Sequence, residues 1–200
     1  MKPMPQRRLD SPLSIVILGL LAERPLHPYG MRALMRERGH DRITGHGSAT
    51  LYDAVNRLAS AGLVEAQESR QEGRRPERTV YRLTTTGSES LQDWLRQALR
   101  DPTGTGQFTA ALSFMYVLPR REVIDLLTVR ATGVQELIRA ADTALAEAIA
   151  AGVPPVFLSE GRYSCALVTA ERDWLATFIA QLSSGELRWP RPRRDHRKAS

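Results

Sequence analysis

The sequence predicts a mainly α-helical protein of the α+β class, in which three short helices and a β-hairpin precede a longer helical region. Apolar residues recur at helical spacing over most of the 200 residues. Strand-like patterning is confined to residues 63–83, on either side of an arginine-rich loop. We therefore divide the chain into residues 1–84, a helical region 85–187, and an Arg- and Pro-rich tail, 188–200, which we expect to be disordered.

The first helix is expected to begin at Ser11-Pro12, because Ser is a good helix cap and Pro suits the first helical position. Residues from Leu13 to Ala22 are apolar on every side, which predicts a buried helix. A buried strand is the alternative for so short a run, and the cap favours the helix. Glu23-Arg24-Pro25 ends it.

The second helix has a weaker start signal, His27-Pro28, in which Pro again suits the first helical position. Met31, Leu34 and Met35 lie three and four residues apart and form its apolar side. Gly39 suits the position just after a helix end. The pattern predicts an amphipathic helix of about three turns.

The third helix follows a polar loop and is expected to have Ser48 as its N-cap and Gly62 at its end. One apolar stripe should pack inward. Its members are Leu51, Val55, Leu58 and Ala59. The opposite face is polar and carries Thr50, Asp53, Asn56, Arg57 and Ser60.

Two short strands, 63–69 and 79–83, flank a loop at 70–78 that holds four arginines together with Gly and Pro. Helices followed by a basic hairpin in this order make up the winged helix-turn-helix plan. We therefore predict an N-terminal winged helix-turn-helix domain over residues 1–84.

The remaining chain is predicted to be helical. Thr86-Gly87-Ser88-Glu89 fits a capping box, 101–106 breaks the pattern, and a long helix runs from about Arg120 to Ala151. A turn at 152–155 precedes a last helix. The apolar stripes exceed what one small bundle would hide, which predicts burial against a second copy; a monomer with an internal core is the alternative.

The net charge of +6 is distributed unevenly along the chain. Residues 1–100 hold 16 basic and 11 acidic residues, 101–187 hold 6 and 10, and 188–200 hold 6 and 1. A basic N-terminal half is typical of proteins that bind nucleic acid or another anionic surface. The acidic middle region should not bind DNA in the same way.

Several function classes are disfavoured by the sequence. The longest apolar run has eight residues, whereas a membrane span needs about 20, and no secretory signal is evident. The single cysteine, Cys165, is expected to be a small core residue and fits a reducing cytoplasm. His27, His40, His46 and His196 lack ligand spacing, and the common catalytic motifs are absent, so we predict no enzyme, metal or cofactor.

If the fold is correct, the third helix enters a major groove and its first turns face the bases. The candidate contacts on this helix are Ser48, Thr50, Tyr52, Asn56 and Arg57. Arg57 suits guanine and Asn56 suits adenine, whereas Tyr52 either reaches a phosphate or packs beneath the helix. Arg74 and Arg75 would contact the backbone or the minor groove. The alternative is a solvated helix face and a charged surface loop.

Trp94 and Trp174 are the candidate residues for binding a small apolar or aromatic effector, because aromatic faces bind flat apolar ligands. Both lie on apolar stripes, so packing in the core is the alternative for each.

Four stretches of the chain resemble the PadR family of bacterial transcriptional regulators, over residues 11–184. The first is Ile17-Leu18-Gly19-Leu20-Leu21-Ala22 with Pro25-Leu26-His27-Pro28-Tyr29-Gly30. The second is Thr50-Leu51-Tyr52 with Arg57-Leu58 and Gly62-Leu63-Val64. The third is Gly73-Arg74-Arg75 with Val80-Tyr81-Arg82-Leu83-Thr84 and Gly87. The fourth comprises Phe108, Leu112, 114–118 and Glu171-Arg172-Asp173-Trp174-Leu175.

The resemblance implies a homodimeric, ligand-responsive repressor with an N-terminal winged helix and a C-terminal helical dimerisation region. In a two-fold dimer, two recognition helices would read successive major grooves, so we expect a pseudo-palindromic operator and a protein that acts at the bacterial nucleoid. Family members often have Gly at the position of Pro28 and Pro at that of Asp53. Asp53 either restrains Arg57 four residues later or accepts a hydrogen bond from a cytosine. The alternative function is a winged-helix protein-interaction module that does not bind DNA.

Overall fold

The computed structural model describes residues 11–40, 48–67 and 79–190, with the backbone alone for 48–50. The described chain packs as two compact units. The first comprises residues up to Leu95 together with Thr109–Val117, and the second comprises Arg96–Phe108 and Leu118–Pro190. Each unit is treated separately below.

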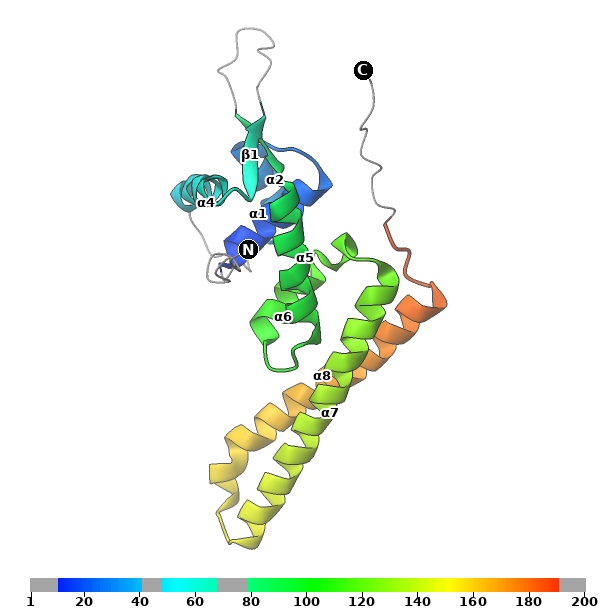
Figure 1. Ribbon diagram of the computed structural model, residues 1–200. Coiled ribbons are helices and arrows are strands. Elements are labelled where there is room, and N and C mark those ends of the chain that lie inside the picture. Colours follow the sequence, from blue (N-terminus) through cyan, green and yellow to red (C-terminus); the bar gives the residue numbers. More distant parts are fainter. Residues whose placement is uncertain (1–10, 41–47, 68–78, 191–200) are drawn as a thin grey trace, which may run out of the picture. The chain divides into compact units, whose positions relative to one another are not determined.

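The first unit contains the predicted helices and hairpin. Helices α1 (Pro12–Glu23), α2 (Pro28–Glu37) and α4 (Ser48–Ser60) precede strands β1 (Val64–Gln67) and β2 (Val80–Leu83), as Figure 1 shows. The strands pair antiparallel, with Val64 opposite Leu83 and Gln67 opposite Val80. This mainly helical arrangement with a small sheet confirms the predicted α+β winged-helix class.

Helix α1 is the centre of the first unit. Its residues from Leu13 to Leu21 are all buried, so the predicted buried helix is confirmed and the strand alternative is wrong. Ser11 is the N-cap residue, but its hydroxyl makes no capping hydrogen bond to the described chain. The Ser11 carbonyl instead accepts from the Ser14 N–H at 2.9 Å, and Pro12 has no N–H to satisfy.

Helix α2 begins with a side-chain cap. The Nδ1 atom of His27 accepts a hydrogen bond from the Gly30 N–H at 2.9 Å, which satisfies one of the free amides of the first turn. After the helix, Gly39 adopts a positive φ of 69°, the left-handed conformation that commonly follows a helix end. The predicted boundaries of this helix are therefore confirmed.

Helix α5 (Thr85–Arg100) begins earlier than its sequence pattern predicts. Its cap is Thr84, whose hydroxyl oxygen accepts from the Gly87 N–H at 3.0 Å and lies 3.0 Å from the Leu63 carbonyl oxygen. A Cβ on Gly87 would overlap that same carbonyl. The capping box predicted at Thr86 is wrong, because contact with the Leu63 carbonyl, just before β1, selects the first turn.

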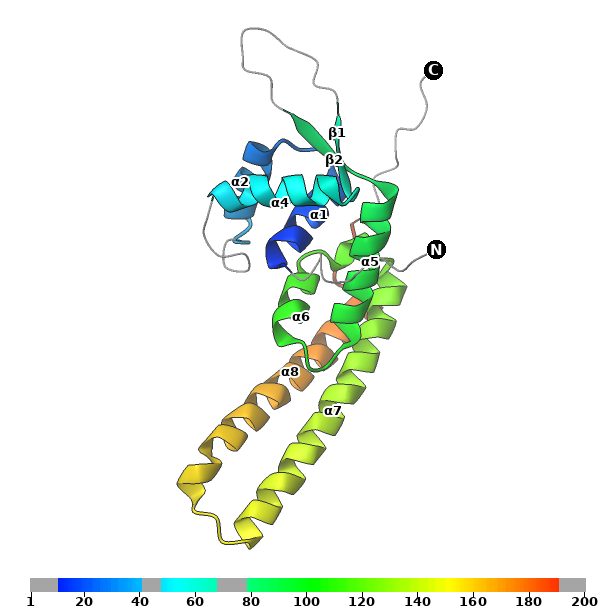
Figure 2. The ribbon, with the colours of Figure 1, turned by 60° about the vertical axis from the view of Figure 1, so that its left-hand side comes forward.

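The helical region continues through α6 (Thr105–Leu112), the short 3-10 helix η2 (Met115–Val117), α7 (Arg120–Ala150), the 3-10 helix η3 (Pro155–Leu158) and α8 (Ser159–Ser184). Helices α7 and α8 run side by side as an antiparallel pair in the second unit (Figure 2). Gly152, at a φ of 76°, lies in the turn between them. The predicted long helix and the turn after it are confirmed.

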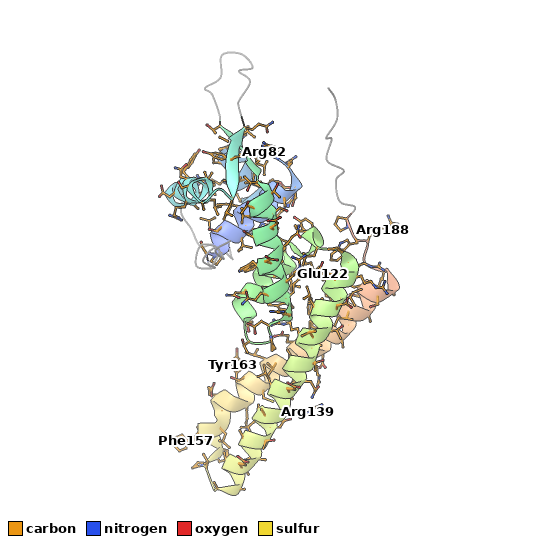
Figure 3. The ribbon with its side chains drawn as sticks, viewed as in Figure 1. Arg82, Glu122, Arg139, Phe157, Tyr163 and Arg188 are labelled. Carbon is orange, nitrogen blue, oxygen red and sulfur yellow. The ribbon has the colours of Figure 1, made fainter. Side chains whose placement is uncertain are left out.

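Much of the apolar surface at the η3 end of the α7–α8 pair is exposed. Phe157 is 76% and Val156 is 71% exposed, and Figure 3 shows the Phe157 and Tyr163 side chains at this end of the hairpin. Ile149 is also exposed, although it lies on the predicted apolar stripe of α7. Large exposed apolar patches of this kind commonly mark interaction surfaces.

Across the described part of the chain, none of the helices combines the length with the apolar character that crossing a bilayer requires.

Candidate nucleic-acid interface and ligand site

Helix α4 separates an apolar side from a polar side, as its sequence predicts. Leu51, Val55 and Leu58 are buried, whereas Asn56 and Arg57 are exposed on the opposite face. This exposed face is the surface from which a helix can reach base edges in a major groove. Because α4 packs against both α1 and α2, these two helices determine how the face is presented.

Tyr52 also lies on the exposed side of α4. Its side chain is 56% exposed, so the alternative in which Tyr52 packs beneath the helix is wrong. Asp53 is exposed as well, and both of its sequence-based roles, towards Arg57 or towards a cytosine, remain predictions.

The other predicted DNA contacts lie where the structure gives little or no side-chain information. Ser48 and Thr50 are within the first turn of α4, of which only the backbone is described, and Ser48 is the first helical residue. Arg74 and Arg75 lie outside the described residues. The strands on either side of their loop are joined across the sheet by an ion pair from Arg82 to Glu65 at 2.9 Å.

In the second unit, the predicted effector residue Trp174 belongs to an aromatic cluster. Its ring stacks on Phe178 with 4.6 Å between centroids, and Phe108 from α6 meets it edge-on at 6.1 Å. Trp174 is nevertheless 42% exposed, so it is only partly a core residue. Trp94 is half-buried on α5, in the first unit.

Beneath this cluster lies a buried charge that the sequence analysis did not identify. Arg130 is 0% exposed, its Nε donates to Glu171 at 2.6 Å, and its Nη1 donates to the Asp101 carbonyl. Its Nη2 is buried with no hydrogen-bond partner among the described residues. The sequence could have indicated that this residue is buried, because residue 130 lies on the buried stripe of α7 between Leu127 and Val134.

Cys165 is half-buried on α8 rather than enclosed in a core. Its Sγ lies 3.4 Å from the Asp142 carboxylate. Partial desolvation and this negative neighbour raise the pKa of the Cys165 thiol, which favours the protonated form. Reactive cysteines need the opposite environment, so a redox-sensing role has no support in this geometry.

Comparison with known proteins finds a family of transcriptional regulators and one of its named members. The model of the Transcriptional regulator PadR-like family matches residues 17–93. The Negative transcriptional regulator PadR of Bacillus subtilis (strain 168) is 26% identical over 179 residues, which cover 85% of this chain and 97% of that protein.

Solved structures of similar proteins have low identity to this chain. They include Bacillus subtilis PadR in complex with operator DNA (22% identity, 85% of this chain and 98% of that one, TM-score 0.38). The same protein with p-coumaric acid has 20% identity, covers 86% and 99%, and has a TM-score of 0.36. A Streptococcus mutans UA159 protein has 19% identity, covers 84% and 98%, and has a TM-score of 0.38.

The family match covers α1 to most of α5 and therefore includes the exposed face of α4. The family consists of regulators rather than enzymes, in keeping with the sequence-based prediction of no catalytic activity. The family match and the curated relative therefore show that this chain is similar to the PadR-like transcriptional regulators.

Proposed function

We propose that this protein is a sequence-specific, DNA-binding repressor that acts as a homodimer and responds to a small ligand. The observation that carries the proposal is the exposed polar face of α4, which presents Tyr52, Asn56 and Arg57 from a helix whose other side is buried. Arginine and asparagine have the donors and acceptors that read guanine and adenine. The relative PadR was crystallised with operator DNA.

The proposed division of tasks follows the sequence. Residues 1–84 bind DNA, 85–187 dimerise and bind the effector, and 188–200 form a basic tail. Within the first part, Ser48, Thr50, Arg74 and Arg75 join the α4 residues as proposed DNA contacts. The protein would act in the bacterial cytoplasm, at the nucleoid.

The proposed dimer surface is the exposed apolar end of the α7–α8 hairpin, represented by Val156 and Phe157. Burying such side chains against a second copy would stabilise the pair by the hydrophobic effect. A two-fold dimer would place two α4 helices in successive major grooves, about 34 Å apart or a multiple of that, which is why the operator should be pseudo-palindromic.

Dimerisation is tested by light scattering on the full chain at micromolar concentration. We expect the mass of two chains for the wild type and a shift towards one chain for Phe157→Asp, because the variant places a charge in the interface. A wild-type mass of one chain would contradict the dimer.

The proposed effector site is the cluster around Trp174, with Trp94 as a separate second candidate. The exposed part of the Trp174 ring offers a face on which a flat apolar ligand can stack. Because the structure of PadR with p-coumaric acid shows that a relative binds an aromatic acid, this compound is a suitable first probe. Binding measured by calorimetry should weaken in Trp174→Leu and also in the presence of saturating DNA.

The decisive experiment is a gel shift on the protein's own promoter region over a salt series. Phosphate contacts release counterions, so the logarithm of the binding constant should fall steeply and linearly with the logarithm of salt concentration. A random duplex of equal length is the control and should bind more weakly. If no shift occurs at low salt, the alternative of a protein-interaction module that does not bind DNA is favoured.

A further inference from the structure

The segment Thr109–Val117 packs within the first unit, although the residues on both sides of it in sequence belong to the second. Phe114, at its centre, is 0% exposed. Its ring lies 5.2 Å from the ring of His40, in the turn after α2, and 6.4 Å from that of Tyr116. This segment therefore contributes buried side chains to the unit that carries α4.

Phe114 packs directly on the backbone of α1. A Cβ built on Gly19 would overlap the Phe114 ring at three of its carbon atoms. Only a residue without a side chain leaves room for the ring at this point of the helix. Phe114 is thus held in a slot that Gly19 opens on the surface of α1.

Two residues after Phe114, the Tyr116 hydroxyl donates a hydrogen bond to Oε1 of Glu23, the last residue of α1. Oε2 of the same carboxylate accepts from Nη2 of Arg38, just after α2, at 2.9 Å, and Arg38 Nη1 donates to Oε1. One carboxylate therefore ties together the end of α1, the end of α2 and η2.

The surroundings of the Glu23 carboxylate favour its ionised form. Burial tends to raise the pKa of Glu23, but hydrogen bonds from Arg38 and Tyr116, with the nearby positive charges, outweigh it and lower the pKa. Burial and the same negative neighbour raise the pKa of Tyr116 far above its ordinary range. The hydroxyl therefore keeps the proton that it donates to Glu23.

We propose that residues 109–117 are a positioning clamp for the DNA-reading face of α4. The clamp holds α1 through Phe114 and fixes both α1 and α2 through Tyr116 and Glu23, and these are the helices against which α4 packs. The clamp lies beyond residues 17–93, which carry the family match. This inference rests on the proposed DNA-binding function, and none of the clamp residues is itself proposed to touch DNA.

The primary test compares Tyr116→Phe with the wild type, using the promoter duplex that the wild type shifts. Binding is measured by fluorescence anisotropy at a temperature well below both unfolding midpoints, so that both proteins are folded. We expect the dissociation constant to rise about tenfold, on the scale of one hydrogen bond to a charged group. Affinity for a random duplex should change much less, because dispersed phosphate contacts tolerate a shifted helix.

The result separates positioning from simple stabilisation. If Tyr116→Phe lowers the unfolding midpoint but the folded protein binds the promoter duplex as tightly as the wild type, the clamp proposal is wrong. If the wild type itself binds no duplex at low salt, the proposed DNA-binding function is wrong instead. The two failures are therefore distinguishable in one experiment.

A matched pair of carboxylate variants provides the control. Glu23→Gln removes the charge of the carboxylate that Tyr116 and Arg38 bind, whereas Glu122→Gln removes the charge of an ion pair with Arg96 (2.6 Å) in the second unit. Only Glu23→Gln should weaken promoter binding. Equal effects of the two variants would overturn the clamp.

A second pair of variants keeps the test valid if Tyr116→Phe does not fold. Gly19→Ala should displace the Phe114 ring and weaken promoter binding. Phe114→Leu in the Gly19→Ala background frees space for the added methyl group and should restore part of the affinity. An additive loss in the double variant would contradict a fit between these two residues.

Discussion

The guanidinium carbon of Arg130 lies 3.7 Å from the centroid of the Phe108 ring, and both side chains are buried in the second unit. The cation thus contacts an aromatic face on one side and the Glu171 carboxylate at its Nε. Its Nη1 donates to the Asp101 carbonyl, just after the C-terminus of α5, where a positive charge is favourable. One side chain therefore joins α5, α6, α7 and α8.

Replacing this cation alone should be costly. Arg130→Met leaves Glu171 without its charge partner in a mostly buried position and should lower the free energy of unfolding by about 3 to 5 kcal/mol. Urea denaturation followed by circular dichroism measures the change. Adding Glu171→Leu should restore part of the loss. The exposed pair of Arg172 and Asp173 is the control, and Arg172→Met should cost less than about 1 kcal/mol.

The cap of α5 gives a second prediction. Thr84→Val removes the hydroxyl that accepts from the Gly87 N–H and should lower the free energy of unfolding by about 1 to 2 kcal/mol. Thr86→Val alters the residue at which the sequence predicts the cap, and it should cost clearly less. A larger loss for Thr86→Val in thermal unfolding would contradict the cap seen in the structure.

Stability should depend on the protonation of Glu23. Its pKa lies below the ordinary value of 4.5 in the folded protein, so the unfolded chain binds this proton more readily. The stabilising contribution is present above pH 4.5 and is lost as the pH falls through the folded pKa. Unfolding midpoints measured on a descending pH series should therefore fall less steeply for Glu23→Gln than for the wild type. Parallel curves for the two proteins would mean that protonation of Glu23 does not contribute to the loss of stability at low pH.

Two arginines should affect DNA binding in different ways. Arg57→Ala, on the exposed face of α4, should reduce the preference for the promoter over a random duplex, because it removes a base contact worth about 1 to 3 kcal/mol. Arg74→Ala, in the hairpin loop, should weaken binding to both duplexes similarly. It should also reduce the slope of the logarithm of the binding constant against the logarithm of salt concentration by the amount expected for about one phosphate contact. Unchanged affinity in both variants would contradict the proposed docking.

Local sequence signals predicted most elements of the fold because the relevant interactions are local. The fully apolar run of α1, the amphipathic pattern of α4 and the glycine after α2 each identify an element without knowledge of its neighbours. The capping box at Thr86 failed because the competing cap, Thr84, depends on a carbonyl from Leu63, a residue distant in sequence. Helix starts are sensitive to such contacts, whereas helix interiors are not.

The same distinction applies to the sites. The exposed residues of α4 follow from periodicity alone, and the proposal of Trp174 as an effector residue rests on its residue type. The burial of Arg130 was not predicted because arginine is ordinarily exposed. Its partners in three other elements offset the cost of removing its charge from water. The association of Tyr116 with Glu23, 93 residues away, has no local signature at all.

The slot that Gly19 opens for Phe114 makes the first unit discontinuous in sequence. A chain shortened to end after α5 would retain every residue of the family match yet leave this part of the α1 surface open to water. Such a fragment should be prone to aggregation, because the apolar strip on α1 loses its cover. Positions 19 and 114 should also vary together among related sequences, with a larger residue at one matched by a smaller residue at the other.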